Sequence, residues 1–226
     1  MVTRKEACAM QDHSLLGHCC PQEMIDKFAQ EVLRYGFKSL CVNGANVTRA
    51  VAALKGQASV AAVVSFPQGA NTTAVKVFEA VDAIRNGADE VDVVINFSRV
   101  KEKNYDYVRN EIAEVVKAVK AEKADAVTKF IIYMPYDNMN PNRLTREEIG
   151  IVGQMIIDCG GDFIKYNENH DYVIERFGDD VKAGRIRLTW SGCPDFETML
   201  KAFDQGVTRI GHEIVPQWLD AHPEFK

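Results

Sequence analysis

Two stretches of the chain decide its fold: Val60-Ala-Ala-Val-Val-Ser-Phe66 and Glu90-Val-Asp-Val-Val-Ile-Asn96. Each is a short, nearly continuous apolar run rich in valine, which is typical of a strand buried on both faces in a parallel sheet. Between them, residues 75–84 place apolar side chains at helical spacing until Asn86-Gly87. Because parallel strands need a crossover connection, the segment predicts a strand–helix–strand unit.

The same alternation extends in both directions along the chain. Further strands are expected at residues 11–16, 39–43, 129–134, 163–166, 186–190 and 209–211. Eight strand–helix units in 226 residues give roughly 28 residues per unit, the spacing of a compact barrel. An open, doubly wound sheet is the alternative, since periodicity cannot show closure, but no GxGxxG motif follows the first strand. We therefore predict an α/β fold, a single (β/α)8 TIM barrel that occupies residues 1–226 as one domain.

The helices between the strands are amphipathic. Each carries one apolar stripe, which we expect to cover the sheet while the opposite face meets water. The clearest stripes are Val75, Phe78, Val81 and Ile84; Val108, Ile112, Val115 and Val119; and Phe196, Met199 and Phe203. Thr145 followed by Glu148 matches a capping box, so a helix is expected to begin directly after Thr145.

Composition and charge exclude several classes of protein. The chain is 46% hydrophobic and 26% charged, as globular proteins are, and its net charge of −5 offers no basic surface to nucleic acid or an anionic membrane. The apolar runs are too short to span a bilayer, and the first residues lack the apolar stretch of a signal peptide. The six cysteines form no CxxC pair. They predict reduced thiols, no disulfide and a cytoplasmic location.

Two charged residues interrupt otherwise apolar strands, Asp92 in residues 91–95 and Lys165 in residues 163–166. Burial lowers the pKa of an ammonium by up to ~3–5 units, which would leave Lys165 as the neutral amine that attacks aldehydes and ketones. A carboxylate such as Asp92 could move protons during that reaction. The alternatives are a lysine at a strand end whose amine reaches solvent, and a structural aspartate satisfied by nearby donors.

Several motifs follow one another along nearly the whole chain. In order they are Asp12-His-Ser-Leu-Leu16, Cys41-Val-Asn43, Ser65-Phe-Pro-Gln-Gly-Ala-Asn-Thr-Thr73, Lys76, Gly87-Ala-Asp-Glu-Val-Asp-Val-Val94, Lys129-Phe-Ile-Ile132, Gly160-Gly-Asp-Phe-Ile-Lys165 and Gly206-Val-Thr-Arg-Ile-Gly211. This series resembles the deoxyribose-phosphate aldolase family, most specifically across residues 61–96. The resemblance implies a barrel and a class I aldolase that joins or splits acetaldehyde and a phosphorylated aldehyde without a metal or an organic cofactor.

The resemblance also implies roles for individual residues. Lys165 falls on the family's Schiff-base lysine, Asp92 on its catalytic aspartate, and Lys129 and Asp12 on the supporting polar network. The residues expected to contact a small carbonyl or sugar-derived substrate are Asp12, Cys41, Asn43, Thr189, Ser191, Gly192, Gly211, His212 and Glu213. A homodimer is the family's habit and is expected here as a possibility.

Three departures from the family pattern concern the last two strands. Thr189 stands where the family has a second lysine, so Lys165 would depend on burial or on Lys129 for a lowered pKa. Gly192-Cys193 replaces the Gly-Gly of the family's phosphate site, and His212-Glu213 replaces a serine pair. Glu213 would oppose a phosphate dianion, so we expect the phosphate site to be modified.

Two smaller features leave alternatives open. His18-Cys19-Cys20 near the expected mouth could bind a metal, but adjacent cysteines make poor chelate geometry, so none is expected. Tyr133, Tyr136 and Trp190 could line a pocket or simply pack under loops. For the whole chain three hypotheses stand: a class I aldolase with an altered substrate, another Schiff-base enzyme such as a dehydratase or cyclase, and a non-catalytic relative that binds a metabolite.

Overall fold

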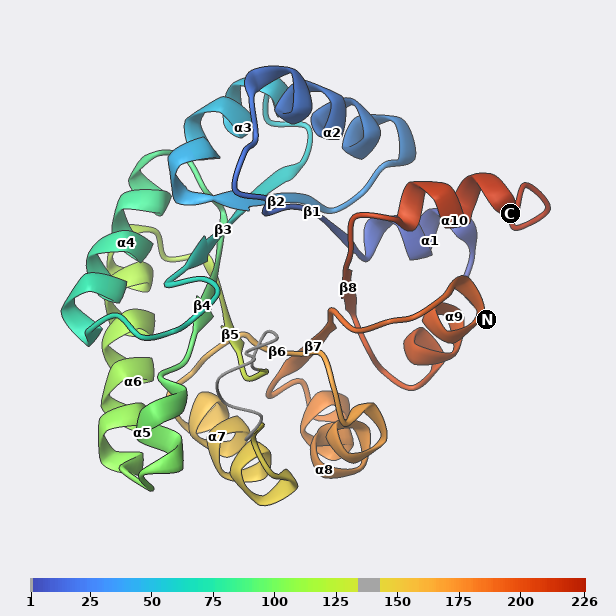
Figure 1. Ribbon diagram of the computed structural model, residues 1–226. Helices are drawn as coiled ribbons and strands as arrows, with labels where there is room; N and C mark the ends of the chain where they lie inside the picture. The colour runs from blue at the N-terminus through green and yellow to red at the C-terminus, as the bar shows by residue number, and fades with distance from the viewer. Residues whose placement is uncertain (1, 134–142) are drawn as a thin grey trace.

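The computed structural model describes residues 2–133 and 143–226, and its centre is a closed barrel of eight parallel strands (Figure 1). The strands pair in the order of the sequence, and β8 pairs with β1 to close the ring. They are β1 (Gln11–Leu15), β2 (Ser39–Asn43), β3 (Ser59–Val64), β4 (Glu90–Val94), β5 (Val127–Ile131), β6 (Phe163–Tyr166), β7 (Arg187–Trp190) and β8 (Arg209–Gly211). Closure confirms the predicted TIM barrel and excludes the open sheet.

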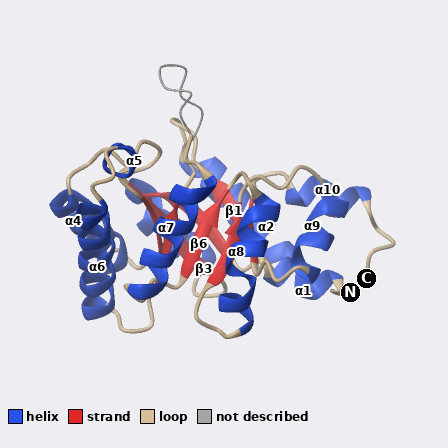
Figure 2. Ribbon diagram, turned by 90° about the horizontal axis from the view of Figure 1, so that it is seen from below, coloured by secondary structure: helices blue, strands red, loops and turns tan. Residues whose placement is uncertain are grey.

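Helices surround this barrel on its outer side (Figures 1 and 2). They are α1 (Arg4–Ala9), α2 (Gln22–Tyr35), α3 (Val47–Leu54), α4 (Thr73–Arg85), α5 (Phe97–Lys101), α6 (Tyr105–Glu122), α7 (Arg146–Asp158), α8 (His170–Lys182), α9 (Phe196–Asp204) and α10 (Val215–Ala221), with the short 3-10 helix η1 (Gly44–Asn46) before α3. Over the described ranges, the helices are all too short or too polar to cross a membrane. Met134 and Tyr136, for which a strand end and a pocket role were expected, lie outside the described residues.

Local sequence signals explain where several helices begin and end. The capping box forms as predicted: the Thr145 side chain accepts a hydrogen bond from the backbone N–H of Glu148, and the Glu148 side chain accepts one from Thr145 N. Gly36 ends α2 in the left-handed conformation at φ 72°, which costs glycine little because it has no Cβ. The predicted stripes of α6 and α9 are buried.

The stripe predicted for α4 is wrong in part. Val75 is 48% and Phe78 is 72% exposed, whereas Ile84 is buried as expected. The buried face of α4 instead carries Lys76 together with small residues. The Lys76 ammonium donates to Val94 O and Glu111 Oε1, each at 2.8 Å, so an ion pair between α4 and α6 fixes the rotation of the helix. Apolar spacing alone could not show which of two faces would turn inward.

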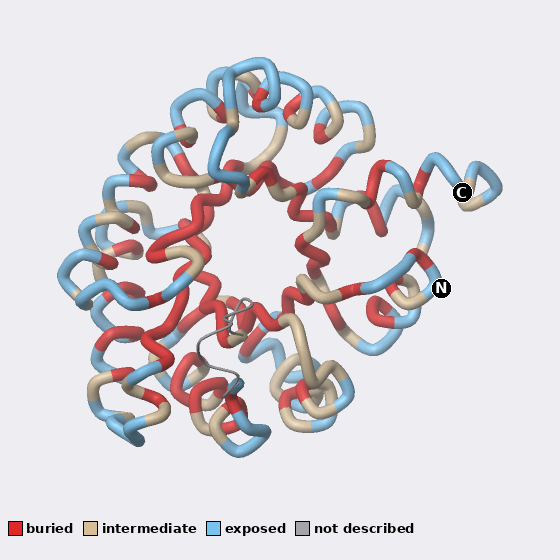
Figure 3. The backbone as a smooth tube through the Cα atoms, in the orientation of Figure 1, coloured by how far each residue is buried: buried red, intermediate tan, exposed pale blue. Residues whose placement is uncertain are grey.

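The strands separate two buried layers, the helix–strand core outside and the barrel interior inside. Figure 3 shows the inner ring of strands as mostly buried, with exposed surface on the outer sides of the helices. Charged side chains meet across the interior: Lys129 on β5 pairs with Asp12 on β1, which is not a neighbouring strand. In register, Asp92 lies beside Lys129 and Lys165 lies beside Thr189. Register neighbours point to the same side of a sheet, so these four side chains all enter the barrel.

Candidate active site

Lys165 and Asp92 meet inside the barrel. Lys165 comes from β6 and Asp92 from β4, and the Lys165 Nζ to Asp92 Oδ2 distance is 2.6 Å. Lys165 is 2% exposed and Asp92 is fully buried. The structure therefore brings together the amine and the carboxylate that the sequence singled out, in contact close enough for direct proton transfer.

The protonation state of Lys165 differs from the one expected from the sequence. Burial by itself lowers the pKa of this ammonium, but the Asp92 carboxylate outweighs burial and raises the pKa above that of an ordinary lysine. In return, although burial raises the pKa of Asp92, Lys129 and Lys165 bring it below its usual value. The prediction of a neutral amine was wrong, because it counted the loss of solvent and not the carboxylate that replaces it. At neutral pH Lys165 rests as an ammonium.

Lys129 lies at the centre of a denser group of charges. Its Nζ is 3.1 Å from Asp12 Oδ2, 2.6 Å from Glu90 Oε2 and 3.0 Å from Asp92 Oδ1. Despite full burial, these carboxylates raise its pKa well above the ordinary value. Arg209 on β8 pairs with Asp12 and, at 3.3 Å, with Glu90. We call Asp12, Glu90, Asp92, Lys129 and Arg209 the ion-paired cluster.

Sequence reasoning missed two members of this cluster, Glu90 and Arg209. Both are the first residue of a strand. Charged side chains at that position are usually solvated, so the position of these two residues did not mark them as part of a site. The signal that could have found them is the two-residue period of a strand, because Glu90 precedes Asp92 by two positions and so shares its inward face. With Lys165, the cluster holds three carboxylates against three cations, which leaves no net charge in the barrel.

A different set of groups lies on the β7 and β8 side of Lys165. Thr189 is fully buried, and its Oγ1 has no hydrogen-bond partner among the described residues. Ser191 is half-buried, and its side chain hydrogen-bonds with the Tyr133 hydroxyl. Ser191 Oγ would lie 3.0 Å from a Cβ built on Gly211, and Lys165 Cε 3.7 Å from it, so the three residues converge. We call Thr189, Ser191 and Lys165 the hydroxyl-lined side. A buried hydroxyl without a partner is costly, so the Thr189 position suits an oxygen atom of a bound molecule.

Three other predicted positions are close to this centre or tied to it. The Cys41 thiol is buried 4.0 Å from Asp92 Oδ2, and burial raises its pKa to about 12, which keeps it a neutral thiol. Asn43 ends β2 and donates to Gly17 O at 3.3 Å, which links the first two loops of the mouth. Tyr133 follows β5 near Lys165: burial raises the pKa of its hydroxyl, and the Lys165 ammonium acts against that effect.

The turns after β7 and β8 hold the remaining predicted residues. Asn167, in the turn after β6, packs against Gly192 so closely that a Cβ there would meet Asn167 O at 2.1 Å. Trp190 points out of the barrel, donates to the same Asn167 O at 2.8 Å and stacks on His170, so it packs under a loop. His212 pairs with Glu213 at 3.1 Å, and the Glu213 side chain is 59% exposed.

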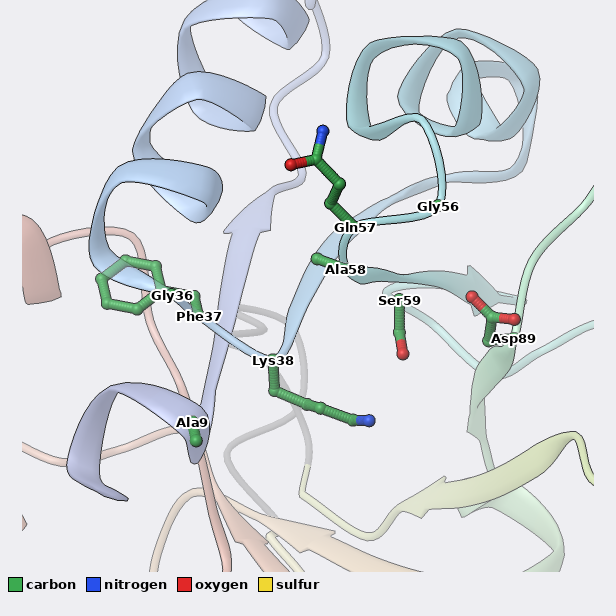
Figure 4. Close-up of a pocket in the computed structure, with 9 residues that line it drawn as sticks. All are labelled: Ala9, Gly36, Phe37, Lys38, Gly56, Gln57, Ala58, Ser59 and Asp89. Carbon is green, nitrogen blue, oxygen red and sulfur yellow. The ribbon is translucent and has the colours of Figure 1, made fainter. Parts of the chain in front are cut away.

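Two other parts of the molecule lie away from this centre. Cys19 is exposed and Cys20 Sγ donates to Gly17 O, and no group of three metal-ligating side chains occurs within residues 2–133 and 143–226. A hollow of about 460 Å³ lies between Phe37, Lys38, Ser59 and Asp89 (Figure 4). These residues precede or begin β2, β3 and β4, so this hollow is at the amino-terminal end of the barrel, away from the loops that carry active sites in this fold.

Comparison with known proteins points to one family. The sequence matches the DeoC/LacD family aldolase model over residues 7–212. A deoxyribose-phosphate aldolase of Thermoanaerobacter sp. (strain X514) is 44% identical over 229 residues, which cover 92% of this chain and 95% of the relative. One from Clostridium perfringens (strain SM101 / Type A) is 39% identical over 222 residues, 92% of each chain. The solved structure of QR15, an aldolase, has a TM-score of 0.82 and 30% identity and covers 98% of this chain and 99% of its own.

These matches extend over the barrel from β1 to β8 and include both residues of the buried lysine–carboxylate pair. Likeness of fold alone would leave the chemistry open, because one barrel serves many reactions. Here the sequence identity is high over nearly the full length of each relative. The chain belongs to the DeoC/LacD family of aldolases and is an aldehyde-lyase.

Proposed function

We propose that this protein is a class I aldolase whose Lys165 forms the Schiff base and whose Asp92 carries the protons. The observation that supports this most directly is the 2.6 Å contact between Lys165 Nζ and Asp92 Oδ2 inside the barrel. An amine that must be an ammonium before reaction and a free base during it needs an acceptor within hydrogen-bond distance. Asp92 is that acceptor.

The first half of the proposed reaction forms the imine. Lys165 passes one proton to Asp92, and the freed amine attacks the carbonyl carbon of an aldehyde to give a carbinolamine. Asp92 then returns the proton to the carbinolamine hydroxyl, which leaves as water, and the nitrogen lone pair forms the C=N bond of the iminium. Lys129 and Arg209 hold Asp12 and Glu90 in place, and Lys129 also contacts Asp92 Oδ1, which leaves Asp92 Oδ2 facing Lys165 as the acid–base group.

The second half breaks or makes a carbon–carbon bond. In the cleavage direction, the β-hydroxyl of the bound aldol passes its proton to the Asp92 carboxylate, its oxygen becomes the carbonyl of the departing aldehyde, and the electrons of the carbon–carbon bond flow to the iminium to give an enamine. Protonation of the enamine and addition of water release the second aldehyde and the free lysine. The named relatives are deoxyribose-phosphate aldolases, which supports acetaldehyde as the fragment held by Lys165. A dehydratase or cyclase would use the same imine, but the relatives do not favour it.

The proposal also covers the rest of the site and its setting. We assign substrate contacts to Asp12, Cys41, Asn43, Thr189, Ser191, Gly192, Gly211, His212 and Glu213, without metal or organic cofactor. Six free thiols favour a reducing, cytoplasmic setting. A homodimer is proposed by analogy with the family.

Trapping the imine tests the proposal. Incubation with acetaldehyde followed by borohydride should add one reduced two-carbon adduct, found by mass spectrometry on the peptide that contains Lys165. Lys165→Arg should abolish the adduct, because a guanidinium stays protonated and cannot attack. Lys27→Arg, at a side chain that is 70% exposed, is the control and should trap like the wild type. An adduct of equal yield in the Lys165→Arg protein would refute the assignment.

A further inference from the structure

A buried ion pair lies outside the barrel, at the end of β4 that leads to the mouth. Its members, Lys76 on α4 and Glu111 on α6, are 0% and 1% exposed, and the two helices lie side by side next to β4 (Figure 1). The Lys76 ammonium donates to Val94 O and to Glu111 Oε1, each at 2.8 Å. The same carboxylate oxygen accepts from Asn96 N at 3.1 Å. The pair therefore holds the backbone of the last residue of β4 and of the turn that follows it.

Pairing between β3 and β4 stops just before this point. The two strands pair only as far as Val64 and Val93, because the chain turns out of the sheet at Ser65, whose φ is 55°. At that turn the Glu79 carboxylate, also on α4, accepts from Ser65 N at 2.8 Å. The next carbonyl of β4 is the one that Lys76 binds. Two charged side chains of one helix therefore fix the ends of both strands where the sheet no longer does.

A second lysine has the same hydrogen-bond pattern at the opposite end of the barrel. The Lys120 ammonium donates to Ala126 O at 2.7 Å and to Asp162 Oδ2 at 2.9 Å, and that carboxylate oxygen accepts from Thr128 N at 2.9 Å. These groups lie where β5 and β6 begin, away from the mouth. The side chains of Lys120 and Asp162 are 32% and 22% exposed, so water can replace their hydrogen bonds. Water has no such access to the pair beside β4.

The end of β4 matters for the reaction because Asp92, two residues before it, contacts two lysines at once. Asp92 Oδ2 is 2.6 Å from Lys165 Nζ, and Asp92 Oδ1 is 3.0 Å from Lys129 Nζ. In the described part of the chain, Asp92 is the one carboxylate paired with Lys165, so a shift of β4 acts directly on this contact. A displacement of about 1 Å at a reacting group can cost on the order of 10²-fold in rate.

From these contacts we propose that Lys76 and Glu111 are positioning residues, which hold the end of β4 so that Asp92 lies against Lys165. The inference rests on the proposed function, in which Asp92 exchanges protons at Lys165. Stability alone is a weak reason for the pair, since apolar side chains of similar volume often replace a buried ion pair without loss of stability. Apolar side chains could not bind the two backbone groups, however, and would leave the end of β4 without these hydrogen bonds.

Hydrogen exchange on acetaldehyde tests the role of the pair. In D₂O the iminium at Lys165 loses a methyl proton to the Asp92 carboxylate, Asp92 exchanges it with solvent, and the enamine takes up deuterium at the same carbon. Hydrolysis then releases labelled acetaldehyde and the free lysine, and proton NMR measures the rate above that of a protein-free sample. Lys76→Met should lower kcat of this exchange by about tenfold or more and change KM for acetaldehyde by less than about threefold, because a displaced base slows proton transfer more than binding.

Lys120→Met is the matched control, because it removes a lysine with the same contacts at the end of the barrel away from Asp92. Its kcat and KM for the exchange should stay close to those of the wild type. A fall in kcat as large as that of Lys76→Met would show that loss of any such lysine disturbs the barrel, and would overturn the proposal.

Variants of Glu111 separate positioning from stability. Lys76→Met combined with Glu111→Leu leaves no unpaired charge, so its denaturant midpoint should stay near that of the wild type while its exchange stays as slow as in Lys76→Met. Glu111→Gln keeps an oxygen acceptor for Asn96 N and Lys76 Nζ, and should exchange faster than Glu111→Leu. Wild-type kcat in Lys76→Met or in the double variant would overturn the proposal, and so would equal rates in Glu111→Gln and Glu111→Leu.

Borohydride trapping of acetaldehyde in the same preparations distinguishes this inference from the proposed function. An adduct on Lys165 of the wild type, together with unchanged exchange in Lys76→Met, refutes only the positioning role. Absence of both the adduct and the exchange in the wild type refutes the Schiff base, and this inference with it.

Discussion

The two sides of the barrel interior differ in how many partners their polar groups have. In the ion-paired cluster, Lys129 has three carboxylate partners within 3.1 Å, and Arg209 closes the group. On the hydroxyl-lined side, Lys165 has one carboxylate partner, and the Thr189 hydroxyl has no hydrogen-bond partner in the described part of the chain. Lys129 and Asp92 on one side and Lys165 and Thr189 on the other are all at most 2% exposed, so exposure does not distinguish these groups.

The difference indicates what each side is for. A buried charge with several partners is held in one position and resists a change of protonation, because losing the proton would leave its partners unpaired. A charged group with a single partner can exchange its proton with that partner. A buried hydroxyl without a partner can form a hydrogen bond with a ligand. We therefore infer that the ion-paired cluster, apart from Asp92, is an electrostatic scaffold, and that the substrate binds at the hydroxyl-lined side.

The largest effect is expected from replacing Asp92, which contacts both Lys129 in the ion-paired cluster and Lys165 on the hydroxyl-lined side. Asp92→Asn should slow turnover by about 10²–10⁴-fold if Asp92 moves the protons. It should also lower the pKa of Lys165, since the carboxylate that raises it is gone and burial then dominates. The rising limb of the rate of acetaldehyde trapping against pH should accordingly move to lower pH.

Glu90→Gln is the control for that experiment, because Glu90 pairs with Lys129 and Arg209 and is not within ion-pair distance of Lys165. Its trapping limb should stay close to that of the wild type. If Asp92→Asn leaves the limb in place, another group sets the pKa of Lys165.

The next largest effect is expected from the centre of the scaffold. Lys129→Met should lower the free energy of unfolding by about 3–5 kcal/mol, because it leaves Asp12, Glu90 and Asp92 with Arg209 and Lys165 as their only counter-charges. Lys165→Met should cost clearly less, since Asp92 keeps Lys129 at 3.0 Å. Denaturant unfolding of both variants measures the difference, and equal losses would show that the two lysines are equivalent.

A smaller effect on the free energy of unfolding is expected from a neutral residue that contacts the ion-paired cluster. Ser39→Ala removes the hydrogen bond from Ser39 Oγ to Asp12 Oδ1, which measures 2.7 Å. We expect a loss of about 1 kcal/mol in unfolding free energy and little change in trapping at Lys165, because Asp12 keeps Lys129 and Arg209 as partners. A large fall in trapping would mean that the scaffold controls the reactive lysine more tightly than the contacts suggest.

Much of the fold could be predicted from local patterns. The strands at residues 39–43, 163–166 and 209–211 lie where the apolar runs placed them, and the capping box at Thr145 forms as its spacing indicated. These features depend on residues close in sequence, which interact in the same way in any surrounding fold. The prediction for α4 was wrong in part because Val75 and Phe78 have helical spacing but lie on the exposed face of the helix. The ion pair between Lys76 and Glu111 on a neighbouring helix places the other face of α4 toward the core.

The sequence by itself determined the series of strand–helix units, the resemblance to the family and the two residues most important to the chemistry, since a lysine and an aspartate inside apolar strands are unusual at any position. Only the tertiary structure decided the charge of that lysine. Lys165 and Asp92 are 73 residues apart, and closure of the barrel brings them to 2.6 Å. Two opposing effects set the pKa of Lys165. Loss of solvation lowers the pKa and could be predicted from the sequence, whereas contact with the opposite charge of Asp92 raises it and depends on where a distant strand lies in the fold.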